Sequence, residues 1–129
     1  MLDSPEICVA LDAVREAAIL ARRIQGEMVG QGLTKEDRSP VTVADYAVQA
    51  LVARRLAERL PGSVLIGEEH AGALQLEEGT FTLDQVTEFV RTAVPDATPE
   101  EVCGWIDRGS GETSQTFWAL DPIDGTKGF

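Results

Sequence analysis

The sequence predicts a layered α/β protein in which helices pack against a sheet. Two observations favour this class. Long segments repeat apolar residues at helical spacing, and two short apolar runs, SVLIG (63–67) and TFWAL (116–120), are typical of buried strands. The predicted order is helix, helix, strand, two short helices, strand.

The first predicted helix runs from Pro5 to about Val29, where apolar residues recur on one face. Ser4 is expected to cap it, because serine followed by proline is a common helix start. Gly30 is expected to end it, because glycine is common just after a helix.

A polar connector, QGLTKEDRSPVTVAD (31–45), precedes the second predicted helix, which ends at Pro61 and Gly62. Its apolar face runs from Ala44 to Leu60. Its other face is expected to be solvated and carries Arg54, Arg55 and Arg59.

The middle of the chain connects the two strands. Residues 70–79 are predicted to form a loop, followed by short helices over 82–94 and 98–107, the second beginning at Thr98 and Pro99. The glycine- and serine-rich segment 108–115 is predicted to be a surface loop.

Composition excludes several classes of protein. The net charge of −11 argues against a nucleic-acid binder, which needs a basic surface. The sequence contains no stretch typical of a membrane span and no signal-peptide pattern, so a cytoplasmic location is expected. Cys8 and Cys103 are predicted to be reduced, packed cysteines, and Trp105 and Trp118 to be core residues.

Acidic residues follow both predicted strands. Glu68 and Glu69 come after the first strand, and Asp121 and Asp124 after the second. In layered α/β proteins, ligands bind beyond the carboxyl ends of strands. Neighbouring carboxylates repel one another unless cations are present, and oxygen ligands suit Mg²⁺. His70 is predicted to be an exposed loop residue without a role, and a zinc site is not favoured.

The turn DPIDGT (121–126) also suits phosphate. Pro122 directs the chain away from the strand, and Gly125 allows a close backbone approach. If a helix begins there, the amides of Gly125 and Thr126 would form an anion site.

Each acidic motif also has an ordinary explanation. Aspartates are common in turns, glutamates after a strand are commonly surface residues, and Thr42 could simply cap the second helix. The three motifs in this order are much harder to explain in that way.

Taken together, SPVTVAD (39–45), GEE (67–69) and DPIDGT (121–126) resemble the inositol monophosphatase superfamily. VTVADYAVQ (41–49), the helical insertion before the second strand and DPIDGTKGF (121–129) are similar to its 3′(2′),5′-bisphosphate nucleotidase branch. This resemblance implies an αβαβα sugar-phosphatase-like fold. It also implies magnesium-dependent, lithium-sensitive removal of the 3′-phosphate from adenosine 3′,5′-bisphosphate, a by-product of sulfate activation.

The resemblance assigns metal ligands by matching position. Two or three Mg²⁺ ions are implied. Glu68 would bind the first, Asp121 would bridge two, the Ile123 carbonyl would complete the first site, and Asp124 would serve the second. Glu69 would help a third ion or its water.

The same resemblance assigns the remaining roles. Asp45 and Thr126 would orient and deprotonate the attacking water, and the amides of Gly125 and Thr126 would hold the phosphate. The implied partner is a small phosphorylated nucleotide, with no nucleic-acid polymer and no membrane.

We expect residues 1–129 to be the N-terminal metal-binding part of a longer phosphatase whose C-terminal substrate-binding domain is absent here. Alone, this part is expected to be nearly inactive. Two alternatives stay open: an enzyme like inositol monophosphatase or inositol polyphosphate 1-phosphatase, or an inactive, truncated metal-binding module.

Overall fold

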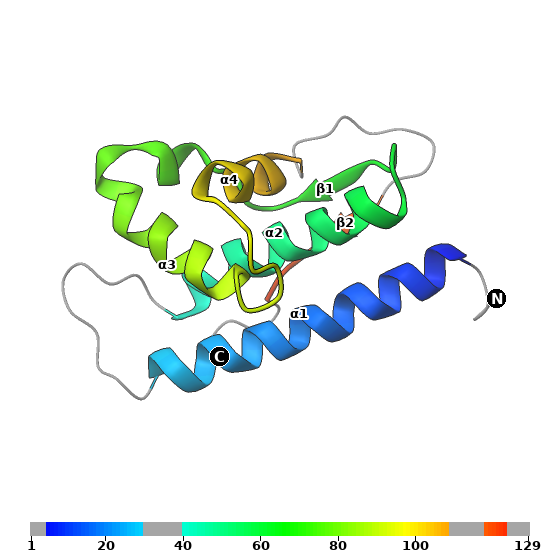
Figure 1. Cartoon of the computed structure of the whole chain (residues 1–129), viewed down its shortest axis with the longest axis horizontal. Coiled ribbons are helices and arrows are strands. Elements are labelled where there is room, and N and C mark those ends of the chain that lie inside the picture. Colours follow the sequence, from blue (N-terminus) through cyan, green and yellow to red (C-terminus); the bar gives the residue numbers. More distant parts are fainter. Residues whose placement is uncertain (1–4, 30–39, 109–117, 124–129) are drawn as a thin grey trace.

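The computed structural model describes residues 5–29, 40–108 and 118–123 (Figure 1). Its elements follow the predicted order. They are α1 (Pro5–Val29), α2 (Pro40–Arg59), β1 (Leu65–Gly67), the 3₁₀ turns η1 (Gly72–Gln75) and η2 (Glu77–Gly79), α3 (Thr80–Val90), α4 (Pro99–Asp107) and β2 (Trp118–Leu120). The predicted caps Ser4 and Gly30, the loop residues 109–115 and the strand residues 116–117 lie outside the described residues.

Helices α1 and α2 form an antiparallel hairpin (Figure 1). The bounds of α1 match the prediction. Helix α2 begins at Pro40, so the predicted connector was wrong over its last residues and Thr42 lies in the first helical turn rather than at a cap. The sequence contained the missed signal, because a serine directly precedes the first proline of α2 as it does that of α1, and proline favours the first helical position.

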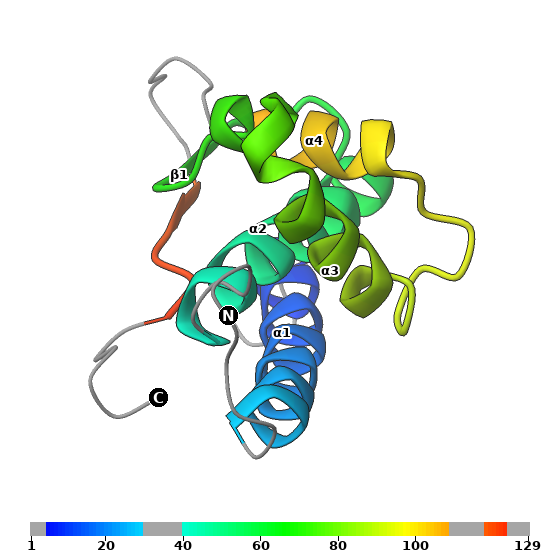
Figure 2. The ribbon, with the colours of Figure 1, turned by 90° about the vertical axis from the view of Figure 1, so that its left-hand side faces the viewer.

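Helix α2 is the centre of the molecule. Figure 2 shows α3 and α4 on one side of it and the strands on another. Its buried alanines, Ala44, Ala47, Ala50 and Ala53, are 0% exposed. Small side chains let neighbouring backbones approach, so α2 packs into two apolar clusters, one with α1, α3 and α4 and one with α1 and β1.

Strands β1 and β2 form a two-stranded parallel sheet. Leu65 pairs with Trp118, Ile66 with Ala119, and Gly67 with Leu120. The Trp118 N–H donates to the Val64 carbonyl at 2.8 Å, which extends the pairing by one contact. Because the strands are parallel, both leave the sheet at the same edge.

The segment between the strands differs from prediction in two details. Residues 70–79 contain η1 and η2, and α3 is shifted, spanning Thr80–Val90 instead of 82–94. Helix α4 begins as predicted after Thr98, whose hydroxyl accepts from the Glu101 N–H while the Glu101 carboxylate accepts from the Thr98 N–H. This capping box satisfies the otherwise unpaired amides of the first turn.

Several single-residue predictions can be compared with the structure. Cys8 and Cys103 are not joined by a disulfide; Cys103 is buried and Cys8 is partly buried. Trp105 and Trp118 are partly buried and pack against the α1–α2–β1 cluster. None of the helices in the described part of the chain has the length and apolar character that crossing a membrane requires.

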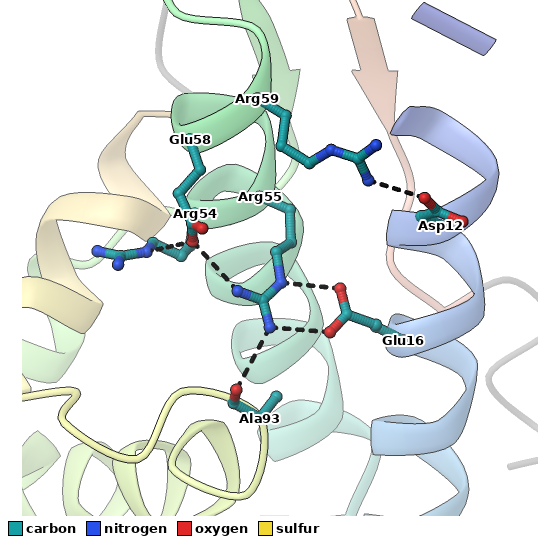
Figure 3. Close-up of polar contacts among 7 residues, drawn as sticks. All are labelled: Asp12, Glu16, Arg54, Arg55, Glu58, Arg59 and Ala93. Carbon is teal, nitrogen blue, oxygen red and sulfur yellow. Dashed lines mark hydrogen bonds and ion pairs between the residues drawn. The ribbon is translucent and has the colours of Figure 1, made fainter. Parts of the chain in front are cut away.

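The arginines of α2 do more than face solvent, which corrects the sequence-based expectation (Figure 3). Arg55 donates to both carboxylate oxygens of Glu16 on α1, each at 2.8 Å, and its side chain is 21% exposed. Arg59 contacts Asp12 at 2.8 Å. The α1–α2 hairpin is therefore joined by ion pairs as well as by apolar packing.

Arg54 and Arg55 also contact Glu58, and two further contacts extend this arginine group. Arg55 donates to the Ala93 carbonyl after α3 at 3.3 Å, and the Arg54 guanidinium lies 5.1 Å from the centre of the Trp105 ring. The hydrogen bond with Glu16 raises the pKa of Arg55. We conclude that Arg55 links three parts of the helical layer.

A double-mutant cycle on Arg55→Met and Glu16→Gln should measure a coupling free energy of about 1 kcal/mol, the upper end for ion pairs near a surface, because this pair is two-pronged and partly buried. The matched control is Arg23→Met with Glu27→Gln, whose atoms lie 3.6 Å apart with both side chains more than half exposed. Its coupling should stay below about 0.3 kcal/mol. Equal couplings in urea unfolding would contradict a special role for Arg55.

Candidate metal and phosphate site

The strand register brings two predicted ligands to one edge of the sheet. Gly67 and Leu120 form the last pair, so the chain leaves the paired region at Glu68 and Asp121. Both residues are exposed. This parallel pairing supports the expectation from the sequence that the acids after the two strands lie near one another.

Asp45 joins this edge from α2. Its pKa is raised from 3.8 to about 6, first by burial and then by the negative charges of Glu69, Glu68 and Asp121, while a backbone hydrogen bond from Ile123 acts in the opposite direction. The carboxylates after β1 and after β2 are therefore close enough to the Asp45 carboxylate to repel it.

Glu69 is partly buried, whereas Glu68 and Asp121 are exposed. Burial and the charge of Glu68 raise its pKa, and His70 acts against them. Its backbone is held by Gln49 of α2: the Glu69 N–H donates to Gln49 Oε1 at 3.0 Å, and Gln49 Nε2 donates to the Glu69 carbonyl at 2.8 Å. His70 itself is exposed.

The donor set fits a hard divalent cation. The charges that act on Asp45 are all negative and all carried by carboxylates, so a cation would relieve their repulsion, and oxygen donors match Mg²⁺. Among the residues that the structure describes, no three acidic, histidine or cysteine side chains are close enough to share one ion. Glu68, Glu69 and Asp121 thus lie near Asp45, but no three of these carboxylates are close enough to bind one ion together.

The second half of the predicted site is only partly described. Ile123 is partly buried and packs against both apolar clusters. Asp124, Gly125 and Thr126, the predicted ligand and phosphate-binding residues, lie outside the described residues. Their roles stay predictions.

Sequence reasoning missed two residues that support this edge. Gln49 lies four residues after Asp45, a spacing that places both on one face of α2. Asp107, at the end of α4, accepts a hydrogen bond from the Ala71 N–H at 2.8 Å. The spacing could have indicated Gln49, whereas nothing in the sequence pairs Asp107 with Ala71.

Comparison with known proteins gives a consistent result. The sequence model of the inositol monophosphatase family matches residues 3–129. A 3′(2′),5′-bisphosphate nucleotidase of Schizosaccharomyces pombe is 36% identical, over 94% of this chain and 38% of its own length. A protein of the same name from Oryza sativa is 39% identical, over 96% of this chain and 38% of its own.

A third relative, the 3′(2′),5′-bisphosphate nucleotidase 2 of Candida albicans, is 35% identical over 96% of this chain and 39% of its own length. The chain therefore spans less than two fifths of the length of the curated relatives it matches.

The raised pKa of Asp45 predicts how stability depends on pH. Between about pH 4 and 6 the unfolded chain loses this proton while the folded chain keeps it, so the carboxyl makes folding less favourable as pH rises. In metal-free buffer, Asp45→Asn should therefore have a higher melting temperature than the parent, and the gap should widen over this range.

The control is Glu58, whose pKa is shifted in the opposite direction from that of Asp45. Burial would raise the pKa of Glu58, but its hydrogen bonds and ion pairs with Arg54 and Arg55 outweigh this and lower it. Glu58→Gln should therefore melt below the parent above the ordinary glutamate pKa of 4.5, with a gap that closes as pH falls further. If the gap for Asp45→Asn is the same at every pH, the gathering of carboxylates around it is refuted.

Proposed function

The chain belongs to the inositol monophosphatase family, and we propose that it supplies the metal-binding part of a phosphomonoester hydrolase. The proposed reaction converts adenosine 3′,5′-bisphosphate to AMP and phosphate. The observation that carries this proposal is that Asp45 lies near enough to Glu68, Glu69 and Asp121, which follow the paired ends of β1 and β2, for their charges to raise its pKa. The similarity to proteins named 3′(2′),5′-bisphosphate nucleotidase supports the choice of substrate.

Metal dependence follows from the chemistry of phosphate esters. The family is generally metal-dependent. Bound Mg²⁺ would lower the pKa of the attacking water and neutralise charge on the leaving oxygen. A cluster of carboxylates would repel a phosphate dianion, so cations held between the two are what allow this acidic edge to accept such a substrate.

The chain's own residues have separate tasks in this proposal. Glu68 and Asp121, which leave the two strands side by side, would hold the cations, with the Ile123 carbonyl and Asp124 completing the set. Glu69 would support a third, looser ion. These assignments rest on position in the motifs.

Asp45 is proposed to take the proton of the attacking water. It comes from the neighbouring helix rather than from a strand end, so it can face the water while the strand acids face the cations. Thr126 would fix the water's geometry, and the amides of Gly125 and Thr126 would hold the phosphate.

Substrate recognition is proposed to depend on a further region of the protein. Because the chain aligns with about 38% of the length of its nucleotidase relatives, we propose that a region matching the remaining length contributes the sugar and base contacts. An inositol phosphate is the alternative substrate, favoured by the name of the family.

The test uses the longest natural polypeptide that contains residues 1–129. Phosphate release should be fast from adenosine 3′,5′-bisphosphate with Mg²⁺, slow from inositol 1-phosphate, and abolished by EDTA. Asp121→Asn and Glu68→Gln should each lower kcat/KM by at least about a hundredfold, because each removes a ligand charge.

The matched control is Glu88→Gln, the same chemical change on a side chain of α3 that is 72% exposed and forms an ion pair with Arg91. It should leave kcat/KM unchanged. Metal-independent turnover, or full activity in Asp121→Asn, would overturn the proposed function. Faster turnover of inositol 1-phosphate would keep the chemistry and replace the substrate.

A further inference from the structure

We propose that Gln49 is a positioning residue that fixes the backbone after β1, so that Glu68 and Glu69 are presented to the same space as Asp45. This inference rests on the proposed function, because its consequence is measured as magnesium affinity. The Gln49 amide bonds to backbone groups of Glu69 and Ile106 and not to a carboxylate. It acts through the main chain.

The hydrogen bonds of Gln49 are unusually complete for a side chain. It is 0% exposed, and its amide makes three bonds. Nε2 donates to the carbonyls of Glu69 and Ile106, both at 2.8 Å, and Oε1 accepts from the Glu69 N–H at 3.0 Å. Both donor hydrogens are used, so rotation of the amide would lose contacts on both sides.

Two of these bonds engage one residue. A side-chain amide that pairs with both the N–H and the carbonyl of Glu69 replaces the pairing that a neighbouring strand would give. β1 ends at Gly67, so the sheet itself no longer holds the chain at Glu69. Gln49 continues the support beyond the end of the strand.

Glu68 is thereby held from both sides. Gly67 before it is paired with Leu120 of β2, and Glu69 after it is fixed by Gln49. The Gln49 side chain starts one helical turn from Asp45. One turn of α2 therefore sets the spacing between the proposed base and the proposed ligands.

Gly67 makes room for this contact. A Cβ atom at residue 67 would lie 2.6 Å from Gln49 Cδ and nearer still to its Oε1, which no side chain tolerates without displacing the amide. The close approach thus needs both a glutamine on α2 and a glycine at the end of β1. Packing against Gln49 therefore explains why the first residue of the GEE motif, Gly67, is a glycine.

The other end of the segment is also fixed. The Ala71 N–H donates to Asp107 Oδ1 at 2.8 Å, next to Ile106, whose carbonyl accepts from Gln49. Residues 69–71 are therefore tied to α2 and to the end of α4. An apolar side chain could fill the space of Gln49, but it would leave the partly buried N–H and carbonyl of Glu69 without these partners.

Three variants of the longest natural polypeptide containing residues 1–129 test this. Gln49→Leu keeps the side chain's approximate size and removes its hydrogen bonds. Gly67→Ala keeps Gln49 and pushes its amide away. Thr87→Val is the control, because Thr87 is 2% exposed and its hydroxyl bonds to Leu83 within its own helix.

Magnesium affinity, measured by titration calorimetry, should fall about 10- to 100-fold in Gln49→Leu and in Gly67→Ala, the usual effect of losing support behind a metal ligand. Thr87→Val should lower the melting temperature and leave the affinity unchanged. In a Gln49→Ala background, Gly67→Ala should have no further effect, because the shortened side chain leaves room for the new methyl group.

Unchanged magnesium affinity in folded Gln49→Leu overturns the inference, and if that variant does not fold, the same result in Gly67→Ala does so. If the unaltered protein takes up no magnesium, the proposed function fails instead. Amide exchange then decides the role of Gln49: the Glu69 N–H should lose protection in Gly67→Ala and keep it in Thr87→Val, and equal protection overturns the inference.

Discussion

The parallel pairing of β1 with β2 is the contact on which the candidate site depends. It is short, with three residue pairs, yet it decides that Glu68 and Asp121 leave the sheet at the same edge. Antiparallel pairing would send the two acids to opposite ends. The main role of the two strands is therefore to align two segments that are distant in the sequence, rather than to form the core.

The site and the core make opposite demands on the fold. Gathering Asp45, Glu69 and their neighbours is unfavourable without cations, as the pKa of about 6 at Asp45 indicates. The helical layer offsets this cost. The close packing of α2 and the ion pairs of Arg55 hold the scaffold rigidly enough for the acids to stay near one another.

The sequence predicted what depends on local pattern. Apolar runs between chain breakers located β1 and β2, and helical spacing located α1, because both signals are read from neighbouring residues. The start of α2 was missed although Ser-Pro marked it. Placing Asp45 with the strand acids required a family resemblance, and Gln49 was missed because a glutamine's partners are set by tertiary packing. The pairing of Arg55 with Glu16 was unpredictable for the same reason.

The register also determines the order in which the parts can form during synthesis. Residue 65 must wait for residue 118 before the sheet exists, whereas every element of the helical layer has already left the ribosome by then. The nascent chain can thus bury α2 first, and the acidic edge forms only after the helical layer. The acidic residues are therefore brought together only after the helical layer has folded.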